Sequence, residues 1–205
     1  ESVARFASSL ASKGIAPGDR VLVFVPMSVE LYIVLLGLFH YGAVAVFIDP
    51  GMALGQIRTA LRLAKPSLVL VPPKIRWLQL LVPALWAQPW LSICSKRLAR
   101  YLRAEKALAV AEVVNEHPAL LTFTSGTTGR PKGVIRSHRF LLDQHQALTD
   151  ALGTRPTDIE MPVLPIFLLN TLAVGATAVI PPVGRRVADA DGQRIAKIIA
   201  NQRVT

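Results

Sequence analysis

Continuous apolar runs rich in β-branched residues alternate with helix-like segments along the first part of the chain. The runs are Val21–Val25, Val44–Ile48 and Ser67–Val71, and turn residues bound them. Strands that are buried on both faces of a parallel sheet have this unbroken hydrophobic pattern. Val29–Tyr41 and Gln56–Lys65, which lie between the runs, have helical patterns. This alternation predicts an α/β fold with parallel sheets flanked by helices.

Capping residues mark the ends of these helices. Ser28 is a candidate N-cap, and Gly42 and Pro66 end the two helices. The alternation continues further along, with strands expected at Val134–Ile135, Asp158–Leu164 and Ala176–Ile180, and helices at His138–Leu152, Phe167–Val174 and Asp191–Asn201. We therefore predict two α/β portions, residues 1–118 and residues 119–205.

A loop rich in glycine, hydroxyl and cationic residues directly follows the apolar run Ala119–Phe123. Its residues are Thr124, Ser125, Gly126, Thr127, Thr128, Gly129, Arg130, Pro131, Lys132 and Gly133. Glycines let backbone N–H groups approach an anion, hydroxyls donate hydrogen bonds, and the two cations add positive charge. The loop lacks the G-x-x-x-x-G-K-[ST] spacing of a Walker A motif. It is interpreted as a polyphosphate cradle, and the alternative is a polar turn between two strands.

This ten-residue segment resembles the phosphate-binding signature of the acyl-adenylate-forming superfamily. That superfamily includes acyl-CoA synthetases, fatty acyl-AMP ligases, luciferases and the adenylation domains of peptide synthetases. The resemblance implies an AMP-forming acid ligase, in which ATP activates a carboxylic acid to an acyl-adenylate and pyrophosphate is released. It implies the large N-terminal domain of the adenylate-forming fold, Mg²⁺ as the companion of ATP, and CoA as one candidate acceptor.

The resemblance also assigns roles within the loop. The ATP phosphates would be held by Thr124, Ser125, Gly126, Thr127, Thr128, Gly129, Lys132 and Gly133. Lys132 would stabilise the charge of the departing pyrophosphate, which gives it a catalytic role. Arg130 is expected only to orient the loop.

Further segments resemble the same superfamily. They are Tyr41–Val44, Asp49–Pro50 and Leu164–Phe167. Leu168 stands where many members carry a histidine that borders the acyl or adenine pocket, so an apolar pocket wall is expected. The spacing is nearest to the branch of long-chain fatty acyl-AMP ligases and olefin β-lactone synthetases, which implies a fatty acid substrate.

The resemblance covers almost the whole chain but only the first part of the superfamily's large domain. It implies that the later glutamate and aspartate motifs, and the small C-terminal domain with its lysine, lie outside these residues. The alternative hypothesis is a truncated, catalytically incomplete remnant that binds nucleotide or a partner without turnover.

Positive charge and tryptophan are concentrated in one segment, residues 74–106. The chain has 23 Lys and Arg against 13 Asp and Glu, a net charge of +10, and 52% hydrophobic residues. Trp77, Trp86 and Trp90 lie among leucines between basic ends, which is typical of a peripheral membrane contact. The alternative is an ordinary packed helix pair. No motif supports nucleic-acid binding.

The remaining features favour a cytoplasmic protein without a structural metal site. Cys94 is the one cysteine, so an internal disulfide is excluded. The apolar stretch Leu31–Ile48 is expected to be a helix and a strand, not a membrane span, because Gly42 divides it. The four histidines are read as packing or surface residues, with His138 placed beside the loop and His40, His117 and His145 without ligand-like spacing.

Overall fold

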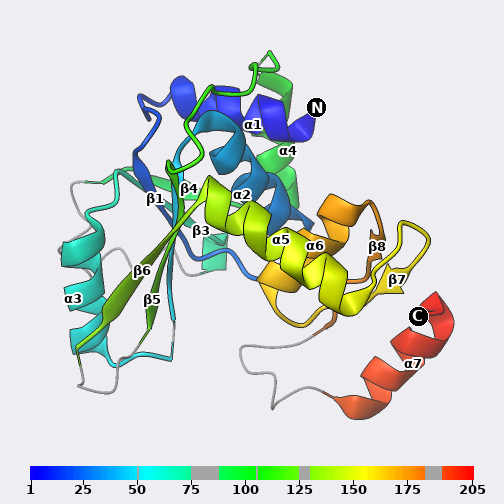
Figure 1. Cartoon of the computed structure of the whole chain (residues 1–205). Coiled ribbons are helices and arrows are strands. Elements are labelled where there is room, and N and C mark those ends of the chain that lie inside the picture. The colour runs from blue at the N-terminus through cyan, green and yellow to red at the C-terminus, as the bar shows by residue number, and fades with distance from the viewer. Residues whose placement is uncertain (50, 75–87, 105, 125–129, 183–190) are drawn as a thin grey trace. The chain divides into compact units, whose positions relative to one another are not determined.

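The computed structural model describes residues 1–49, 51–74, 88–104, 106–124, 130–182 and 191–205. These residues form two compact units, Glu1–Phe140 and Leu141–Thr205 (Figure 1). The predicted boundary after residue 118 does not coincide with this division after Phe140, because residues 118–137 belong to the first unit. The proposed pair of subdomain portions therefore stays a prediction.

A six-stranded sheet forms the centre of the first unit. Its strands are β1 (Arg20–Val23), β2 (Val44–Ile48), β3 (Leu68–Val71), β4 (Trp90–Ser92), β5 (Pro118–Thr124) and β6 (Lys132–Ser137), arranged in the order β4-β3-β1-β2-β5-β6. All neighbours are parallel except β5 and β6, which form an antiparallel pair. The predicted α/β fold with a parallel sheet is confirmed.

Helices cover both faces of this sheet. They are α1 (Ser2–Ala11), α2 (Val29–Tyr41), α3 (Leu54–Ala64), α4 (Ser95–Ala104) and the start of α5 (His138–Leu152). α1 packs against both α2 and α4, whereas α3 packs against β2 and contributes Ala60, Leu61 and Ala64 to the core of the sheet (Figure 1). The strands β1, β2 and β3 are thus buried on both faces, which explains why they read as unbroken apolar runs.

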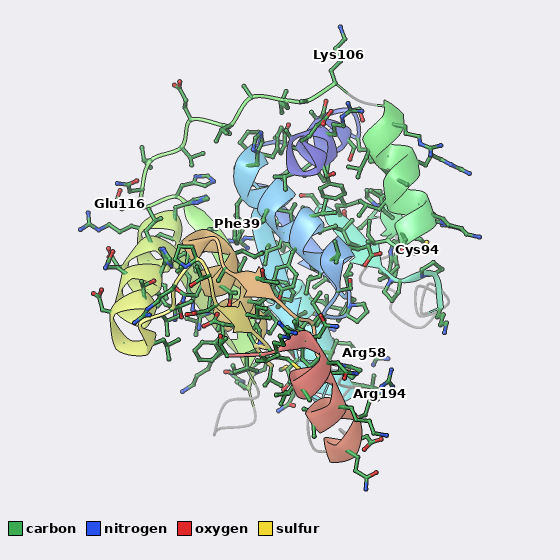
Figure 2. The ribbon with its side chains drawn as sticks, turned by 90° about the vertical axis from the view of Figure 1, so that its right-hand side faces the viewer. Phe39, Arg58, Cys94, Lys106, Glu116 and Arg194 are labelled. Carbon is green, nitrogen blue, oxygen red and sulfur yellow. The ribbon has the colours of Figure 1, made fainter. Side chains whose placement is uncertain are left out.

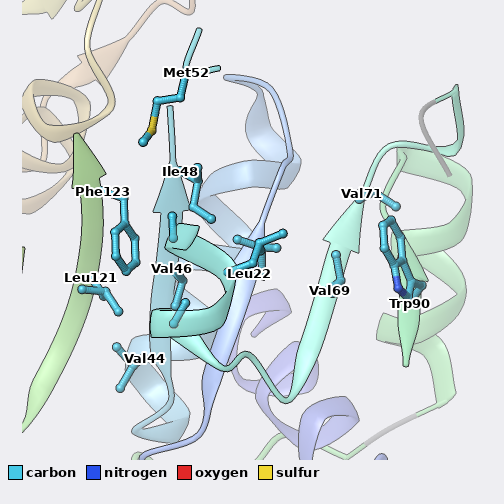
Figure 3. Close-up of a cluster of buried hydrophobic side chains, with 13 residues drawn as sticks. Leu22, Val44, Val46, Ile48, Met52, Val69, Val71, Trp90, Leu121 and Phe123 are labelled. Atoms are coloured by element: carbon cyan, nitrogen blue, oxygen red, sulfur yellow. The ribbon is translucent and has the colours of Figure 1, made fainter. Parts of the chain in front are cut away.

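The core under α3 is a row of side chains that crosses five strands. Neighbouring residues in the register are Trp90, Val69, Leu22, Val46 and Leu121, each at most 9% exposed. Figure 3 shows the row together with Phe123 and Ile48, which pair with each other two residues further along β5 and β2. A continuous layer of this kind fixes the register of the sheet, because a one-residue slip would turn every one of these side chains to the other face.

The caps expected for α2 are present. The Ser28 hydroxyl accepts a hydrogen bond from the Leu31 N–H at 3.3 Å, and Gly42 ends the helix in the left-handed conformation, with φ 77°. Residues with a side chain pay a steric cost in that conformation, and glycine does not. These two residues therefore set the bounds of α2 at the predicted positions.

We expect Ser28→Ala to lower the free energy of unfolding by about 1 kcal/mol, because the Leu31 N–H loses its partner. Ser28→Asp keeps an acceptor at the cap and should stay within a few tenths of a kcal/mol of the parent. Urea unfolding of both variants measures the effect. Equal stability of the alanine and aspartate variants would show that the cap contributes nothing here.

The second unit contains a short parallel pair of strands and three helical segments. β7 (Ile159–Glu160) pairs with β8 (Thr177–Ala178), and α6 (Pro165–Val174) and α7 (Gly192–Gln202) accompany most of α5. Longer strands were predicted at 158–164 and 176–180. The ladder between β7 and β8 is only two residue pairs long, and α6 begins at Pro165, directly after the first of these predicted strands.

The described part of the segment 74–106 contains β4 and α4. Strand β4 begins at Trp90, which is buried at 9% exposure, so this tryptophan is a core residue. Trp77 and Trp86 lie outside the described residues. Within the described part of the chain, no helix has the length and apolar character needed to cross a bilayer.

Candidate functional site

The base of the predicted phosphate loop is the end of the β5–β6 hairpin at which the loop joins the two strands. In the antiparallel register Thr124 lies opposite Lys132 and Phe123 lies opposite Gly133. The predicted loop residues Ser125, Gly126, Thr127, Thr128 and Gly129 lie outside the described residues. The structure therefore describes the two strand ends that hold the loop, and a hairpin takes the place of the expected continuation of a parallel sheet.

Gly133 packs directly against an aromatic ring, which leaves little room for a side chain at this position. A Cβ at this position would lie 3.0 Å from Cε1 of Phe123, 3.2 Å from its Cζ and 3.3 Å from Cδ1 of Leu121. Phe123 itself is only 4% exposed and belongs to the core under α3. This close packing connects the loop base directly to the sheet core.

Thr124 and Lys132 are both exposed at this end of the hairpin. Lys132 forms no ion pair with any of the described residues, so no described carboxylate neutralises it. An ammonium group that is solvated and unpaired retains its full charge for an incoming anion. This arrangement fits the role predicted for Lys132.

Arg130 and Pro131 lie at the surface near α3. They line a depression together with Gly55, Gln56, Thr59 and Leu63 of that helix. Pro131 is buried and Arg130 is exposed. The end of the loop therefore lies beside α3, and the expected orienting role of Arg130 stays a prediction.

Arg136 braces the hairpin and was not identified from the sequence. Its Nη1 donates to Oγ1 of Thr122 at 2.7 Å, and its guanidinium carbon lies 5.7 Å from the centroid of the Phe140 ring. Thr122 pairs with Val134, so the bond runs diagonally across the two strands. Only the strand register places these two side chains together, and the sequence contains no signal for it.

His138 lies at the other end of the same hairpin, in an aromatic cluster. Its ring centroid is 5.9 Å from that of Phe39 and 6.1 Å from that of His117. The Nε2 of His117 bonds the Gly42 carbonyl at 2.8 Å, and Ser137 caps α5 by accepting from the Phe140 N–H at 3.2 Å. His138 is consequently a packing residue and Ser137 is the cap. His138 lies at the end of the hairpin away from the loop, so the prediction that placed it beside the loop is wrong.

Burial lowers the pKa of His138 below its ordinary value, and the charge of the neighbouring His117 lowers this pKa further. Since an unfolded histidine titrates near about 6.5, the unfolded chain binds more protons than the folded chain as the pH falls below that value. We expect the free energy of unfolding to fall on acidification through this window.

His138→Phe should reduce this pH dependence because it removes the group while keeping a ring against Phe39. Urea unfolding of parent and variant at pH above 7 and at pH below 6 gives the comparison. Parallel pH profiles for the two proteins would contradict the assignment.

A network of polar side chains joins the elements of the second unit. Asn170 is 3% exposed, and its Oδ1 lies 2.7 Å from Nδ1 of His145 and 3.3 Å from Oγ1 of Thr149. The carboxylate of Glu160 accepts from Thr154 at 2.8 Å and from Thr171. These bonds connect α5, α6 and β7, so His145 has the structural role predicted for it.

Leu168 lies on α6 and is 2% exposed. A buried apolar residue thus stands at the position where the resemblance implies a histidine. The wall of an acyl pocket at this position stays a prediction.

The described residues contain no group of three or more His, Cys, Asp or Glu side chains that could hold a metal ion. Cys94 is a free, partly buried thiol. The donor set of the described part therefore does not fit a resident Mg²⁺ site, because Mg²⁺ takes carboxylate and other oxygen ligands.

Comparison with known proteins gives a consistent picture. The family model described as AMP-binding enzyme matches residues 1–205. An olefin beta-lactone synthetase of Stenotrophomonas maltophilia is 33% identical over 209 residues, which cover 97% of this chain and 38% of that protein. Acyl-CoA synthetase short-chain family member 3 of Mus musculus is 30% identical over 185 residues, covering 78% of this chain and 27% of that protein.

The fold has a close counterpart among solved structures. ATP-bound MatB from Rhodopseudomonas palustris superposes with a TM-score of 0.84 at 24% identity, over 100% of this chain and 41% of that one. This likeness confirms the predicted fold class. The chain thus spans about two fifths of the Stenotrophomonas and Rhodopseudomonas proteins.

Proposed function

Because this chain belongs to the AMP-binding enzyme family, we propose that its parent protein activates a carboxylic acid with ATP, forming an acyl-adenylate and releasing pyrophosphate. The resemblance to adenylate-forming enzymes predicted from the loop is thereby confirmed at the level of the family. The chain spans 38% of the Stenotrophomonas relative, so activity is proposed for the parent protein.

The observation that carries the proposal is the unpaired Lys132 opposite Thr124 at the base of the glycine-rich loop. In the proposed reaction a carboxylate oxygen attacks the α-phosphorus of ATP. The bond from this phosphorus to the bridging oxygen of pyrophosphate breaks, and its electron pair leaves with pyrophosphate. Lys132 stabilises the negative charge that grows on the leaving group.

The loop residues supply positioning in this proposal. Backbone N–H groups and hydroxyls of 125–129 would bind the phosphates, and Thr124 and Gly133 would hold the two ends of the loop. Displacement by a carboxylate needs no general base, so orientation and electrostatics carry most of the rate enhancement. Pro131 beside α3 and the packing of Phe123 on Gly133 would limit the motion of the loop ends.

We propose a fatty acid as the substrate. Two observations support it: a relative described as an olefin beta-lactone synthetase is 33% identical, and the interior position of Leu168 is apolar. ATP as co-substrate is supported by the ATP-bound state of MatB. Mg²⁺ would arrive with the ATP phosphates, and CoA is one candidate for the final acceptor, which an internal hydroxyl or a carrier protein could replace.

We also propose that the parent protein works in the cytoplasm, with a peripheral membrane contact through residues 74–106. The support is the concentration of cations in this segment, since anionic lipids attract Lys and Arg near the surface. Trp90 does not contribute, because it is buried in β4.

ATP–pyrophosphate exchange with the full-length parent protein tests the proposed chemistry. A panel of short-chain, long-chain and β-hydroxy long-chain acids should give exchange that is strongest with a long-chain member. Exchange confined to short-chain acids would overturn the fatty acid assignment and leave acid activation in place. No exchange with any acid by a folded protein would overturn acid activation itself.

A second candidate function follows from the observation that the chain spans only part of its relatives' length. If these residues exist as a separate protein, they would bind nucleotide or a partner without turnover. Calorimetric titration of the 205-residue chain with ATP, followed by the exchange assay, separates the two cases. Binding without exchange supports the remnant, and exchange overturns it.

A further inference from the structure

Helix α4 carries the densest positive charge in the described part of the chain. Its sequence from Ser95 to Ala104 includes four cations, Lys96, Arg97, Arg100 and Arg103, and no acidic residue. All four cations are exposed, and Figure 2 shows nitrogen-tipped side chains projecting from this helix away from the body of the ribbon. No described ion pair offsets the repulsion among these four cations.

Three of these cations lie on one face. Lys96, Arg100 and Arg103 are spaced by four and three residues, which places them in line along a helix. Together with Ala99 they line a depression on the surface. We call these three residues the α4 cationic face.

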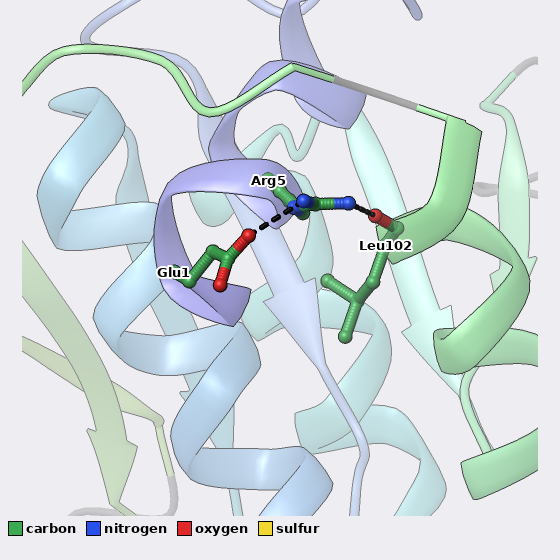
Figure 4. A network of polar contacts seen from close by, with 3 residues as sticks. All are labelled: Glu1, Arg5 and Leu102. Atoms are coloured by element: carbon green, nitrogen blue, oxygen red, sulfur yellow. Dashed lines mark hydrogen bonds and ion pairs between the residues drawn. The ribbon is translucent and has the colours of Figure 1, made fainter.

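The other side of α4 is fixed to the first unit. Leu98 is 3% exposed, and the Leu102 carbonyl accepts a hydrogen bond from Nη1 of Arg5 at 3.0 Å (Figure 4). At the start of the helix, the Ser95 hydroxyl donates to the Glu30 carboxylate at 2.5 Å. The helix is therefore held in one orientation, with its cations outward.

The two acids nearest to α4 already have partners of their own. Glu30 accepts from Ser95, and Glu1 pairs with Arg5 at 2.5 Å. Lys13 adds a further positive charge, since its ammonium lies 5.4 Å from the centroid of the Tyr101 ring on α4. The α4 cationic face is thus complementary to an anionic partner, and no described carboxylate pairs with it.

We propose that the α4 cationic face docks the protein on an anionic membrane surface by binding lipid phosphates. The inference rests on the peripheral membrane contact proposed above and is independent of the acid-activating chemistry. Guanidinium groups match phosphate oxygens in a two-pronged geometry, and the three cations from Lys96 to Arg103 span about 10 Å along the helix. Each cation near an anionic leaflet contributes roughly fivefold to partitioning.

A membrane suits this face better than a nucleic acid does. The exposed positions of α4 offer cations with Ser95 and Ala99 but no amide side chain to read a base edge. Tyr101 is partly buried and engaged by Lys13, so it offers no free ring for base stacking. Nucleic-acid binding is accordingly one outcome that the test must be able to reveal.

Helix α3 provides a matched control. Arg58, Arg62 and Lys65 are also exposed and have the same spacing of four and three residues. They stand on the helix that covers the other face of the sheet. Replacing these three removes the same charge as replacing Lys96, Arg100 and Arg103.

Sedimentation with vesicles tests the proposal on the full-length parent protein. We expect binding to phosphatidylcholine vesicles that contain about one third phosphatidylglycerol, weaker binding at high salt, and none to pure phosphatidylcholine. The variant Lys96→Gln, Arg100→Gln, Arg103→Gln should lose about 100-fold in partition coefficient with an unchanged thermal midpoint. The variant Arg58→Gln, Arg62→Gln, Lys65→Gln should lose fivefold or less.

Three results would overturn the inference. Equal losses in the two variants would assign the binding to overall charge, and full retention by the α4 variant would place the contact elsewhere. Retention on duplex DNA without binding to anionic vesicles would identify a nucleic-acid surface. In the last case the peripheral membrane contact also fails, while the exchange assay still reports separately on acid activation.

Discussion

Phe123→Ala is expected to lower the free energy of unfolding by about 3–5 kcal/mol, the usual cost of removing a buried ring. Phe123 is 4% exposed and lies in the core under α3, opposite Ile48 on β2. The lost ring leaves a void that the sheet cannot close, because its backbone is held by ladders on both sides of β5. Urea unfolding of the variant measures the loss.

Phe140→Ala is the matched control. This ring has the same size but is 47% exposed, and its only described ring partner is Arg136. We expect a loss below about 1 kcal/mol, in line with surface substitutions. Losses of similar size in the two variants would contradict the assignment of Phe123 to the core.

Gly133→Ala connects this core residue to the loop base. In the parent protein the new methyl group would lie 3.0 Å from the Phe123 ring, so the ring or the strand must shift. In the Phe123→Ala background that obstacle is gone. We therefore expect the two changes to be non-additive by about 1 kcal/mol or more, and additive effects would show that the contact is not strained.

The helices that could be predicted well are those whose ends are encoded locally. For α2, Ser28 and Gly42 carry the capping chemistry, and the predicted bounds Val29–Tyr41 are those observed. α5 was likewise predicted at His138–Leu152, as observed. Short-range hydrogen bonds decide such ends, so neighbouring residues contain the information.

Strands were harder to predict where pairing decides them. β4 was missed because Trp90 and its neighbours resemble a membrane-facing segment until β3 is placed beside them. β6 was predicted only at Val134–Ile135, although it runs from Lys132 to Ser137. Its outer residues are polar and become a strand only through the antiparallel ladder with β5.

In the candidate site, too, the residue types were predictable from the sequence and their arrangement was not. The chemistry of Lys132 and Gly133 could be recognised from residue types and order. Their mutual arrangement could not, because it depends on the hairpin register that sets Thr124 opposite Lys132 and Phe123 opposite Gly133. Arg136 was missed for the same reason, since its bond to Thr122 crosses two strands.

Lys132→Ala is expected to reduce kcat/KM for ATP by about 5- to 150-fold in the exchange assay, which corresponds to the roughly 1–3 kcal/mol of a hydrogen bond to a charged group. The physical reason is the loss of an unpaired ammonium group at the loop base, where charge grows on pyrophosphate. Because Lys132 is exposed and has no described ion pair, the free energy of unfolding should change by less than about 0.5 kcal/mol.

Two further variants test whether the position and shape of the Lys132 charge matter, or only the presence of a positive charge on the protein. Lys106→Ala removes an equally exposed lysine from the first unit and should leave kcat/KM for ATP within about twofold of the parent. Lys132→Arg retains the charge but exchanges a compact ammonium for a planar guanidinium, so it should recover only part of the loss. If Lys132→Ala and Lys106→Ala behaved alike, the lysine at the loop base would be peripheral to the chemistry, and the loop's backbone N–H groups would have to carry the phosphates without it.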